Sequence, residues 1–134
     1  MTTANDIQIG GDHYKTSNLQ PWDLISRHNI AFLEGNIIKY MTRWRSKNGV
    51  QDLKKVQHYI TKIEEIHDTG YEPTGSAGPK MVEDYCVANH VSDFREVIVI
   101  SIFSNKWNAN QLNHAALLVD SLIVSESDGQ AETA

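Results

Sequence analysis

The sequence predicts an all-α fold, and three observations support that prediction. Two segments, 31–45 and 50–67, carry apolar residues at helical spacing. The Asn48-Gly49 pair between them is a turn signal, so the two helices should pack as an antiparallel hairpin. The third observation is that 40% of the 134 residues are hydrophobic, which is enough apolar surface for one core. We therefore expect one small helical domain, or one domain with a dependent appendage.

The residues before the hairpin divide into an arm and a short helix. Residues 1–20 are polar and contain glycine, so we expect an arm rather than a packed element. A helix should begin at Pro21, because the missing N–H of proline costs little in the first helical turn. We expect this helix over 21–28. Residues 21–67 then form one helical unit behind the arm.

Composition changes after the hairpin. Residues 68–79 hold three of the eight glycines and two of the three prolines, which is typical of a flexible linker. Residues 80–124 are strongly apolar and should form a second helical unit. The last ten residues, 125–134, are polar and acidic, and we expect a disordered tail there.

The apolar run 97–103 has two interpretations. Taken alone, it is continuous and rich in β-branched residues, as in a buried strand. At an offset of 61 residues it aligns with the first half, so the second half could be a degenerate copy of one three-helix unit. The run would then be a central helix, either within the chain or at a subunit interface. The match is one of pattern more than identity, and the sequence leaves it open. The counterparts of Asn36, Lys39 and Arg43 would be Val97, Ile100 and Ser104.

Charge and composition exclude several classes of protein. The formal net charge is −5, whereas general nucleic-acid coat proteins are usually basic, so nucleic acid is not an expected partner. The single cysteine, Cys86, cannot form an internal disulfide and suits a reducing cytosol. No window reaches the length of a membrane span, and no signal-peptide pattern precedes the first helix. We expect a soluble, cytoplasmic protein without a membrane partner.

A cationic stripe on the segment 31–45 and just beyond it is the main candidate site. Asn36, Lys39, Arg43 and Lys47 fall within about 80° of one another on a helical wheel. Arginine offers phosphate a rigid fork, and lysine offers a mobile point charge. Asn36 can donate and accept, so it could read a sugar or a base edge. The alternative is a solvated helix face with ordinary lysines.

The motifs of the first half resemble a known phage family. They run His13-Tyr14-Lys15, then Gly35-Asn36-Ile37-Ile38-Lys39-Tyr40-Met41-Thr42-Arg43, then Lys47, then Asp52-Leu53-Lys54-Lys55 and Tyr59. This order resembles the small phage-encoded nucleotide kinase family and covers roughly 55 of the 134 residues. The resemblance implies transfer of phosphate to a deoxynucleoside monophosphate in the cytoplasm of an infected host cell. A nucleoside triphosphate would be the phosphate donor.

The resemblance also implies roles for individual residues. Lys39, Arg43 and Asp52 would be catalytic, with Asp52 orienting Arg43 or acting as a base toward an acceptor phosphate. Simple stabilisation of a helix N-terminus is the alternative for Asp52. Tyr40 could contact the nucleotide or belong to the hairpin interface. The nucleotide-binding set would be His13, Tyr14, Lys15, Asn36, Lys39, Tyr40, Arg43 and Lys47.

No sequence motif indicates a metal site or a cofactor. There is no phosphate-binding P-loop and no nucleophile elbow. A need for magnesium stays open; without it, Lys39, Arg43 and Lys47 would neutralise phosphate charge, with Lys15 closing from the arm. The second function hypothesis is a non-catalytic protein that sequesters a nucleotide signal of host defence. A third is an interaction protein with a vestigial site. The apolar second half further suggests a homo-oligomer.

Overall fold

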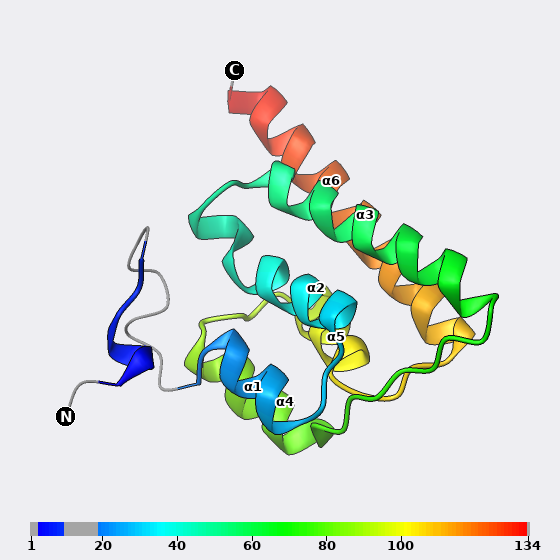
Figure 1. Ribbon diagram of the computed structural model, residues 1–134. Helices are drawn as coiled ribbons and strands as arrows, with labels where there is room; N and C mark the ends of the chain where they lie inside the picture. The colour runs from blue at the N-terminus through cyan, green and yellow to red at the C-terminus, as the bar shows by residue number, and fades with distance from the viewer. Residues whose placement is uncertain (1–2, 10–18, 134) are drawn as a thin grey trace.

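The computed structural model describes residues 3–9 and 19–133. Within these residues it contains six α-helices, two short 3₁₀ helices and no strand, which confirms the all-α prediction (Figure 1). The α-helices are α1 (Pro21–Arg27), α2 (Phe32–Arg43), α3 (Val50–His67), α4 (Gly78–Ala88), α5 (Phe94–Phe103) and α6 (Ala109–Thr133). The 3₁₀ helices are η1 (Ala4–Asp6) and η2 (Trp44–Ser46). Within the described part, no helix is both long and apolar enough to cross a bilayer.

The hairpin of α2 and α3 turns at the predicted glycine. α2 ends at Arg43 and passes into η2, so the regular helix stops two residues before the expected end at 45. Such tightening is common at helix C-termini. Gly49 then adopts a positive φ of 58°, which glycine tolerates without steric cost, and its N–H donates to the Trp44 carbonyl (2.8 Å). The bounds of α1 and α3 agree with the predicted segments to within one residue.

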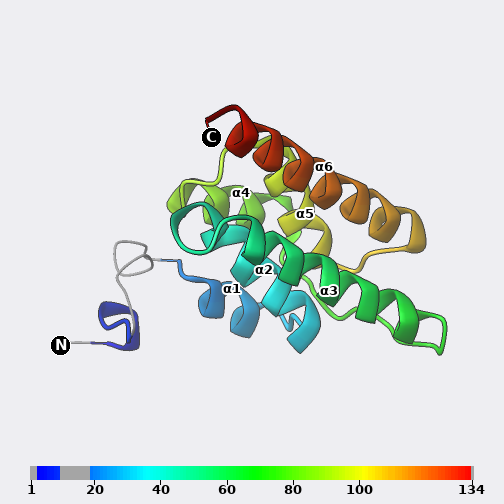
Figure 2. The same cartoon turned by 90° about the horizontal axis from the view of Figure 1, so that it is seen from above.

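The core lies between the hairpin α2–α3 and the hairpin α5–α6. α2 packs on α5 at the centre, and α3 runs beside α6 along one side of the molecule (Figure 1 and Figure 2). α1 packs on α2, and α4 packs on α5. Full burial of one large apolar side chain contributes about 1.5–3 kcal/mol, so this core orders the helices. The inner face of α3 is buried at Leu53, Val56, Ile60 and Ile63 and partly buried at Tyr59 and Ile66.

The run 97–103 belongs to the helix α5 and not to a strand. Asp93 caps this helix by accepting a hydrogen bond from the Arg95 N–H (2.9 Å). α5 contacts α2, α4 and α6, and its side chains Val99, Ile100 and Phe103 are fully buried. The apolar run is therefore covered within the chain, so it supplies no argument for a subunit interface.

The two halves have the same order of elements and share a local backbone feature. Asn29 after α1 and His90 after α4 are 61 residues apart, and both have left-handed backbone, with φ of 56° and 58°. The residue after each closes the helix in the same way: Ile30 N–H donates to the Ile25 carbonyl (3.2 Å), and Val91 N–H donates to the Cys86 carbonyl (2.9 Å). These bonds also obey the offset of 61, which supports the internal repeat.

The segment between the halves is held against both of them. The Thr74 hydroxyl donates to the Asn29 carbonyl (2.6 Å), and the Ser76 N–H donates to the His28 carbonyl (3.0 Å). The Ala77 N–H donates to the Ser104 carbonyl (3.0 Å). We call residues 71–77 the strap. The sequence predicts a flexible linker here, but the structure shows a segment held by hydrogen bonds. The reason is that the carbonyls at the ends of α1 and α5 lack partners in their own helices and accept from the strap instead.

The end of the chain also differs from expectation. α6 continues through Thr133, although the sequence predicts a disordered tail over 125–134. The packed part of α6 supplies the helical nucleus, and each further residue then adds one hydrogen bond at little entropic cost. The polar composition of the tail does not by itself stop such propagation.

Candidate functional site

A buried ion pair joins the end of α2 to the start of α3. The Asp52 carboxylate is 0% exposed and accepts from Arg43 Nε (3.3 Å) and Nη2 (3.5 Å). Asn48 Nδ2 (3.4 Å) and Lys55 Nζ (3.3 Å) donate to the same carboxylate. Burial alone would raise the pKa of Asp52, but the hydrogen bonds from Arg43 and Asn48 and the charge of Arg43 outweigh it, so the pKa is lowered. Asp52 is therefore ionised at neutral pH and fixes the Arg43 guanidinium.

The ring of Tyr40 lies under three positive charges. The distance from the ring centroid is 4.7 Å to Arg43 Cζ, 5.0 Å to Lys55 Nζ and 5.5 Å to Lys39 Nζ. Cations at such distances are attracted by the negative face of an aromatic ring. The ring of Tyr59 lies beside it, with 6.1 Å between the centroids. Tyr40 thus serves both the hairpin interface and the charged surface above it.

Four cations gather at this end of the hairpin. Burial lowers the pKa of Lys39, and the positive charges of Arg43, Lys47 and Lys55 lower it further. Mutual repulsion of this kind is relieved when an anion binds among the charges. We call Lys39, Arg43, Lys47 and Lys55 the cation cluster.

The structure places the predicted stripe in three different environments. Arg43 is buried on Asp52, and Lys39 is half-buried above Tyr40. Lys47 lies past the end of α2, at the C-cap of η2, and is exposed. The helical-wheel angle assigned to Lys47 does not apply, because α2 ends at Arg43 and the chain becomes 3₁₀ before this residue. Lys47 nevertheless stays close enough for its charge to act on Lys39.

Asn36 lies one turn before Lys39 and faces an apolar groove. Its Nδ2 donates to the Phe32 carbonyl of the same helix (2.8 Å). Asn36 and Lys39 both line the groove between the N-terminal arm, α1 and α2. The three remaining predicted binding residues, His13, Tyr14 and Lys15, lie outside the described residues.

The glycine of the motif serves helix packing. A Cβ on Gly35 would lie 3.1 Å from Cδ1 of Ile25 on α1, so the absence of a side chain lets α1 approach α2 closely. Gly35 also lines the groove beside Asn36. One residue therefore fits both of the roles that a glycine inside a helix suggests, contact with a neighbouring helix and access to the backbone.

Sequence reasoning missed two residues of this site. Lys55 follows Asp52 by three positions on α3, and Asn48 precedes it by four. The i, i+3 spacing of Asp52 and Lys55 is a usable signal, because side chains three apart are neighbours on a helix. The turn residue Asn48 had no such signal, since its approach to Asp52 depends on the backbone at Gly49.

A second buried acid, apart from Asp52, lies on α2. Glu34 is buried and accepts from Tyr71 Oη of the strap (2.8 and 3.1 Å) and from Trp107 Nε1 (3.3 Å). Burial and the hydrogen bond to Glu34 raise the pKa of Tyr71, so this phenol stays a donor. The contacts come from segments 37 and 73 residues away, which no local pattern reveals. This cluster ties the strap to the core.

The charged groups of the described part do not form an acidic metal site. No group of three or more His, Cys, Asp and Glu side chains within residues 3–9 and 19–133 is arranged to hold a metal ion.

The comparisons with known proteins concern the first half of the chain. Residues 10–61 match the family model described as a protein of unknown function, DUF3310. No curated protein and no solved structure matches the chain. The matched segment includes every member of the cation cluster, Tyr40 and Asp52. In this segment the chain is similar to the DUF3310 family.

Proposed function

We propose that this chain binds a deoxynucleoside monophosphate through the cation cluster and acts as a nucleotide kinase-like protein. The observation that carries the proposal is the gathering of three cations over Tyr40, with Lys47 close enough for its charge to act on Lys39, beside the buried Asp52 and on a chain whose net charge is −5. A local positive site on an acidic chain is a specific feature rather than a consequence of overall charge. A phosphate is the anion that suits it best, because it accepts from several donors at once.

The members of the cation cluster would have different roles in binding phosphate. The mobile ammonium groups of Lys39, Lys47 and Lys55 would neutralise phosphate oxygens, and the Arg43 fork would set the position of one phosphate. Asp52 would act as a positioning residue for Arg43. Its lowered pKa makes it a weak base, which disfavours the alternative role in proton transfer.

The kinase part of the proposal draws on the resemblance to the phage nucleotide kinase family. Phosphoryl transfer depends mainly on positioning and on neutralising charge, both of which the cluster could supply. A nucleoside triphosphate would donate the phosphate, with or without magnesium. The setting would be the cytoplasm of an infected host cell.

The test combines turnover with binding. The purified chain is incubated with each deoxynucleoside monophosphate and ATP, with and without magnesium, and the formation of diphosphate is measured. Lys39→Ala should abolish most of the product, whereas Lys62→Ala should not. Lys62 is the matched control, since it is an exposed lysine on α3 that pairs only loosely with Glu65 (3.7 Å). Equal activity of the two variants would reject the cluster as the site.

Binding without turnover is the second candidate. The Arg43–Asp52 pair favours it, because a cation held by an internal carboxylate is fixed before the ligand arrives. Such a site can bind ground state and transition state alike, which gives affinity without rate. Nucleotide binding without diphosphate would then indicate sequestration of a nucleotide, such as a signal of host defence. Failure to bind any nucleotide would reject both candidates and leave an interaction protein.

A further inference from the structure

An apolar groove lies beside the cation cluster. It has a volume of about 670 Å³ and is formed by the N-terminal arm, α1 and α2. Lys39 lines the groove and also belongs to the cluster, so the two features are continuous. Its lining includes the side chains of Ile7, Ile9, Trp22, Phe32, Asn36 and Lys39.

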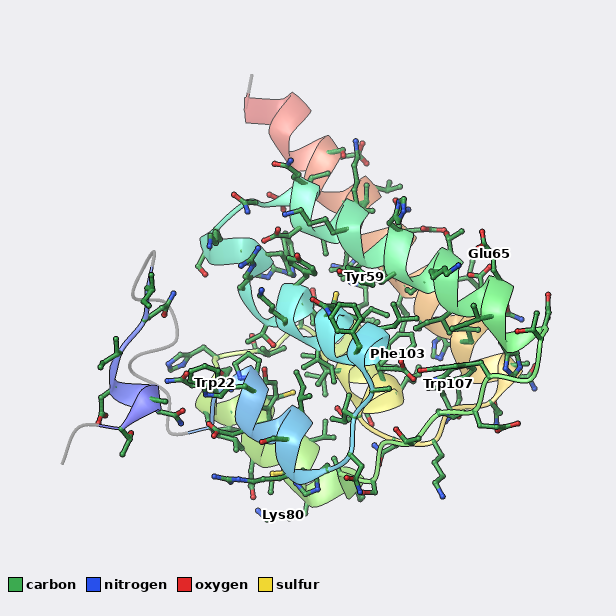
Figure 3. All side chains as sticks on the ribbon, viewed as in Figure 1. Trp22, Tyr59, Glu65, Lys80, Phe103 and Trp107 are labelled. Atoms are coloured by element: carbon green, nitrogen blue, oxygen red, sulfur yellow. The ribbon has the colours of Figure 1, made fainter. Side chains whose placement is uncertain are left out.

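The outer wall of the groove is anchored rather than loosely placed. The arm carries Asn5, whose Nδ2 donates to Asp23 Oδ2 (2.6 Å) and whose Oδ1 accepts from Trp22 Nε1 (2.6 Å). The Gln20 side chain donates to the Asn5 carbonyl (2.7 Å). Figure 3 shows Trp22 on the side of α1 nearest to the arm. Three hydrogen bonds therefore hold residues of the arm against the start of α1.

Aromatic surface is exposed in this groove. Phe32 is 75% exposed and Trp22 is 50% exposed, although both are large apolar side chains. Neighbouring exposed apolar residues on a small protein indicate a surface that binds something. Flat aromatic rings of this kind can stack on any of the nucleobases, because every base has a π face.

We propose that the groove holds the base of the bound nucleotide, while its phosphate lies on the cation cluster. This inference rests on the proposed function. Phe32 and Lys39 are seven residues apart, about 10 Å along α2, and the Lys39 side chain leans back toward the start of the helix. A mononucleotide can bridge that span. Asn36 lies between the two and offers an amide oxygen to a base or sugar donor.

The test separates the base from the phosphate. The affinity of the four deoxynucleoside 5′-monophosphates and of 2-deoxyribose 5-phosphate is measured by calorimetry on the full chain. Phe32→Ala should weaken the nucleotides about five- to a hundredfold and leave deoxyribose 5-phosphate unchanged. Phe94→Ala is the matched control: Phe94 opens α5 as Phe32 opens α2, and it is 68% exposed. It should change neither affinity.

Tryptophan fluorescence supplies a second readout. Trp44 and Trp107 are buried, so quenching by a stacked base reports mainly on Trp22. The nucleotides should quench this emission, deoxyribose 5-phosphate should not, and Trp22→Phe should remove the effect.

Two other outcomes would each overturn the inference. If Phe32→Ala binds nucleotides as the unmodified chain does, the base lies elsewhere and only the proposed phosphate site survives. If neither the nucleotides nor deoxyribose 5-phosphate bind, the proposed function fails and the base site fails with it.

Discussion

Arg43 and Asp52 form a buried ion pair that links the last residue of α2 to the first turn of α3. The pair has two effects that can be measured separately. It contributes to the stability of the hairpin, because each buried charge depends on the other. It also fixes a guanidinium in the cation cluster before any ligand arrives.

Replacing Asp52 by asparagine should destabilise the chain by about 3 kcal/mol, because Arg43 is left buried without a counter-charge. Urea unfolding followed by circular dichroism measures this loss. Glu65→Gln is the control on the same helix, since its contact with Lys62 is exposed and should contribute at most about 0.5 kcal/mol. Equal losses of unfolding free energy would mean that the buried ion pair stabilises the chain no more than the exposed pair does.

The contribution of Asp52 should depend on pH. The ordinary pKa of an aspartate is about 3.9, and that of Asp52 is lowered in the folded chain. Stability from this group is therefore present above about pH 4 and is lost as the pH falls through the folded value. The gap in unfolding free energy between the unmodified chain and Asp52→Asn should be constant from pH 7 to pH 5 and shrink below about pH 4. A gap that widens on acidification would contradict the assigned direction.

The strap and the α1–α2 contact should respond differently to an added methyl group. A Cβ on Gly75 would lie 2.7 Å from the backbone C and O of Ser104, so Gly75→Ala must displace backbone and should cost about 1–3 kcal/mol. The Cβ of Gly35→Ala meets the flexible Ile25 side chain, and alanine gains about 1 kcal/mol of helix propensity. Gly35→Ala should therefore be close to neutral. Thermal midpoints compare the two, and a harmless Gly75→Ala would show that the strap is not held tightly.

Glycine should stabilise the two left-handed positions to different extents. A histidine at φ 58° bears the steric cost of that region, so His90→Gly should stabilise the chain by about 1 kcal/mol. Asparagine tolerates the left-handed region better than histidine does. Asn29→Gly should therefore change the free energy of unfolding by only about a few tenths of a kcal/mol. The denaturant midpoints of the two variants show which glycine substitution stabilises the chain more. Destabilisation by His90→Gly would mean that the imidazole makes contacts worth more than the strain.

Arg43 should matter for ligand binding beyond its charge. Arg43→Ala should weaken mononucleotide binding about ten- to a hundredfold, since charge-assisted hydrogen bonds contribute about 1.5–3 kcal/mol each. Lys62→Ala removes the same charge from an exposed place and should have little effect. Titrations are run below the thermal midpoints of both variants, because Arg43→Ala also leaves Asp52 unpaired. Equal losses would mean that net charge alone governs binding.

Most of the fold could be predicted because its signals are local. The apolar spacing of α2 and α3, the proline that opens α1 and the glycine at the turn each act within a few residues. The strap could not be predicted, because its hydrogen bonds go to His28, Asn29 and Ser104, which are distant in sequence. Glycine and proline content indicates the absence of a helix but not the presence of distant partners.

One part of the candidate site could be predicted from the sequence, and another part could not. Lys39 and Arg43 are one helical turn apart, so their common face follows from spacing. The convergence of Lys55 on Tyr40 depends on how α3 docks on α2, which is a tertiary fact. The groove depends on a hydrogen bond between Asn5 and Trp22, which are 17 residues apart, so no local pattern predicts it. The nucleotide-binding and catalytic roles themselves stay predictions.

The pairing of α2 with α5 and of α3 with α6 has a consequence for stoichiometry. A chain that ended after α3 would leave those faces of the first hairpin open to water, and a second copy of the chain would be needed to cover them. Here the cover is covalently attached. It has the same order of helices as the first half and the same left-handed residue after its first helix. At the offset of 61 it carries Val97, Ile100 and Ser104 in place of Asn36, Lys39 and Arg43. The α5–α6 hairpin thus covers the first hairpin as a second subunit would, and the proposed phosphate site is predicted to occur once per chain.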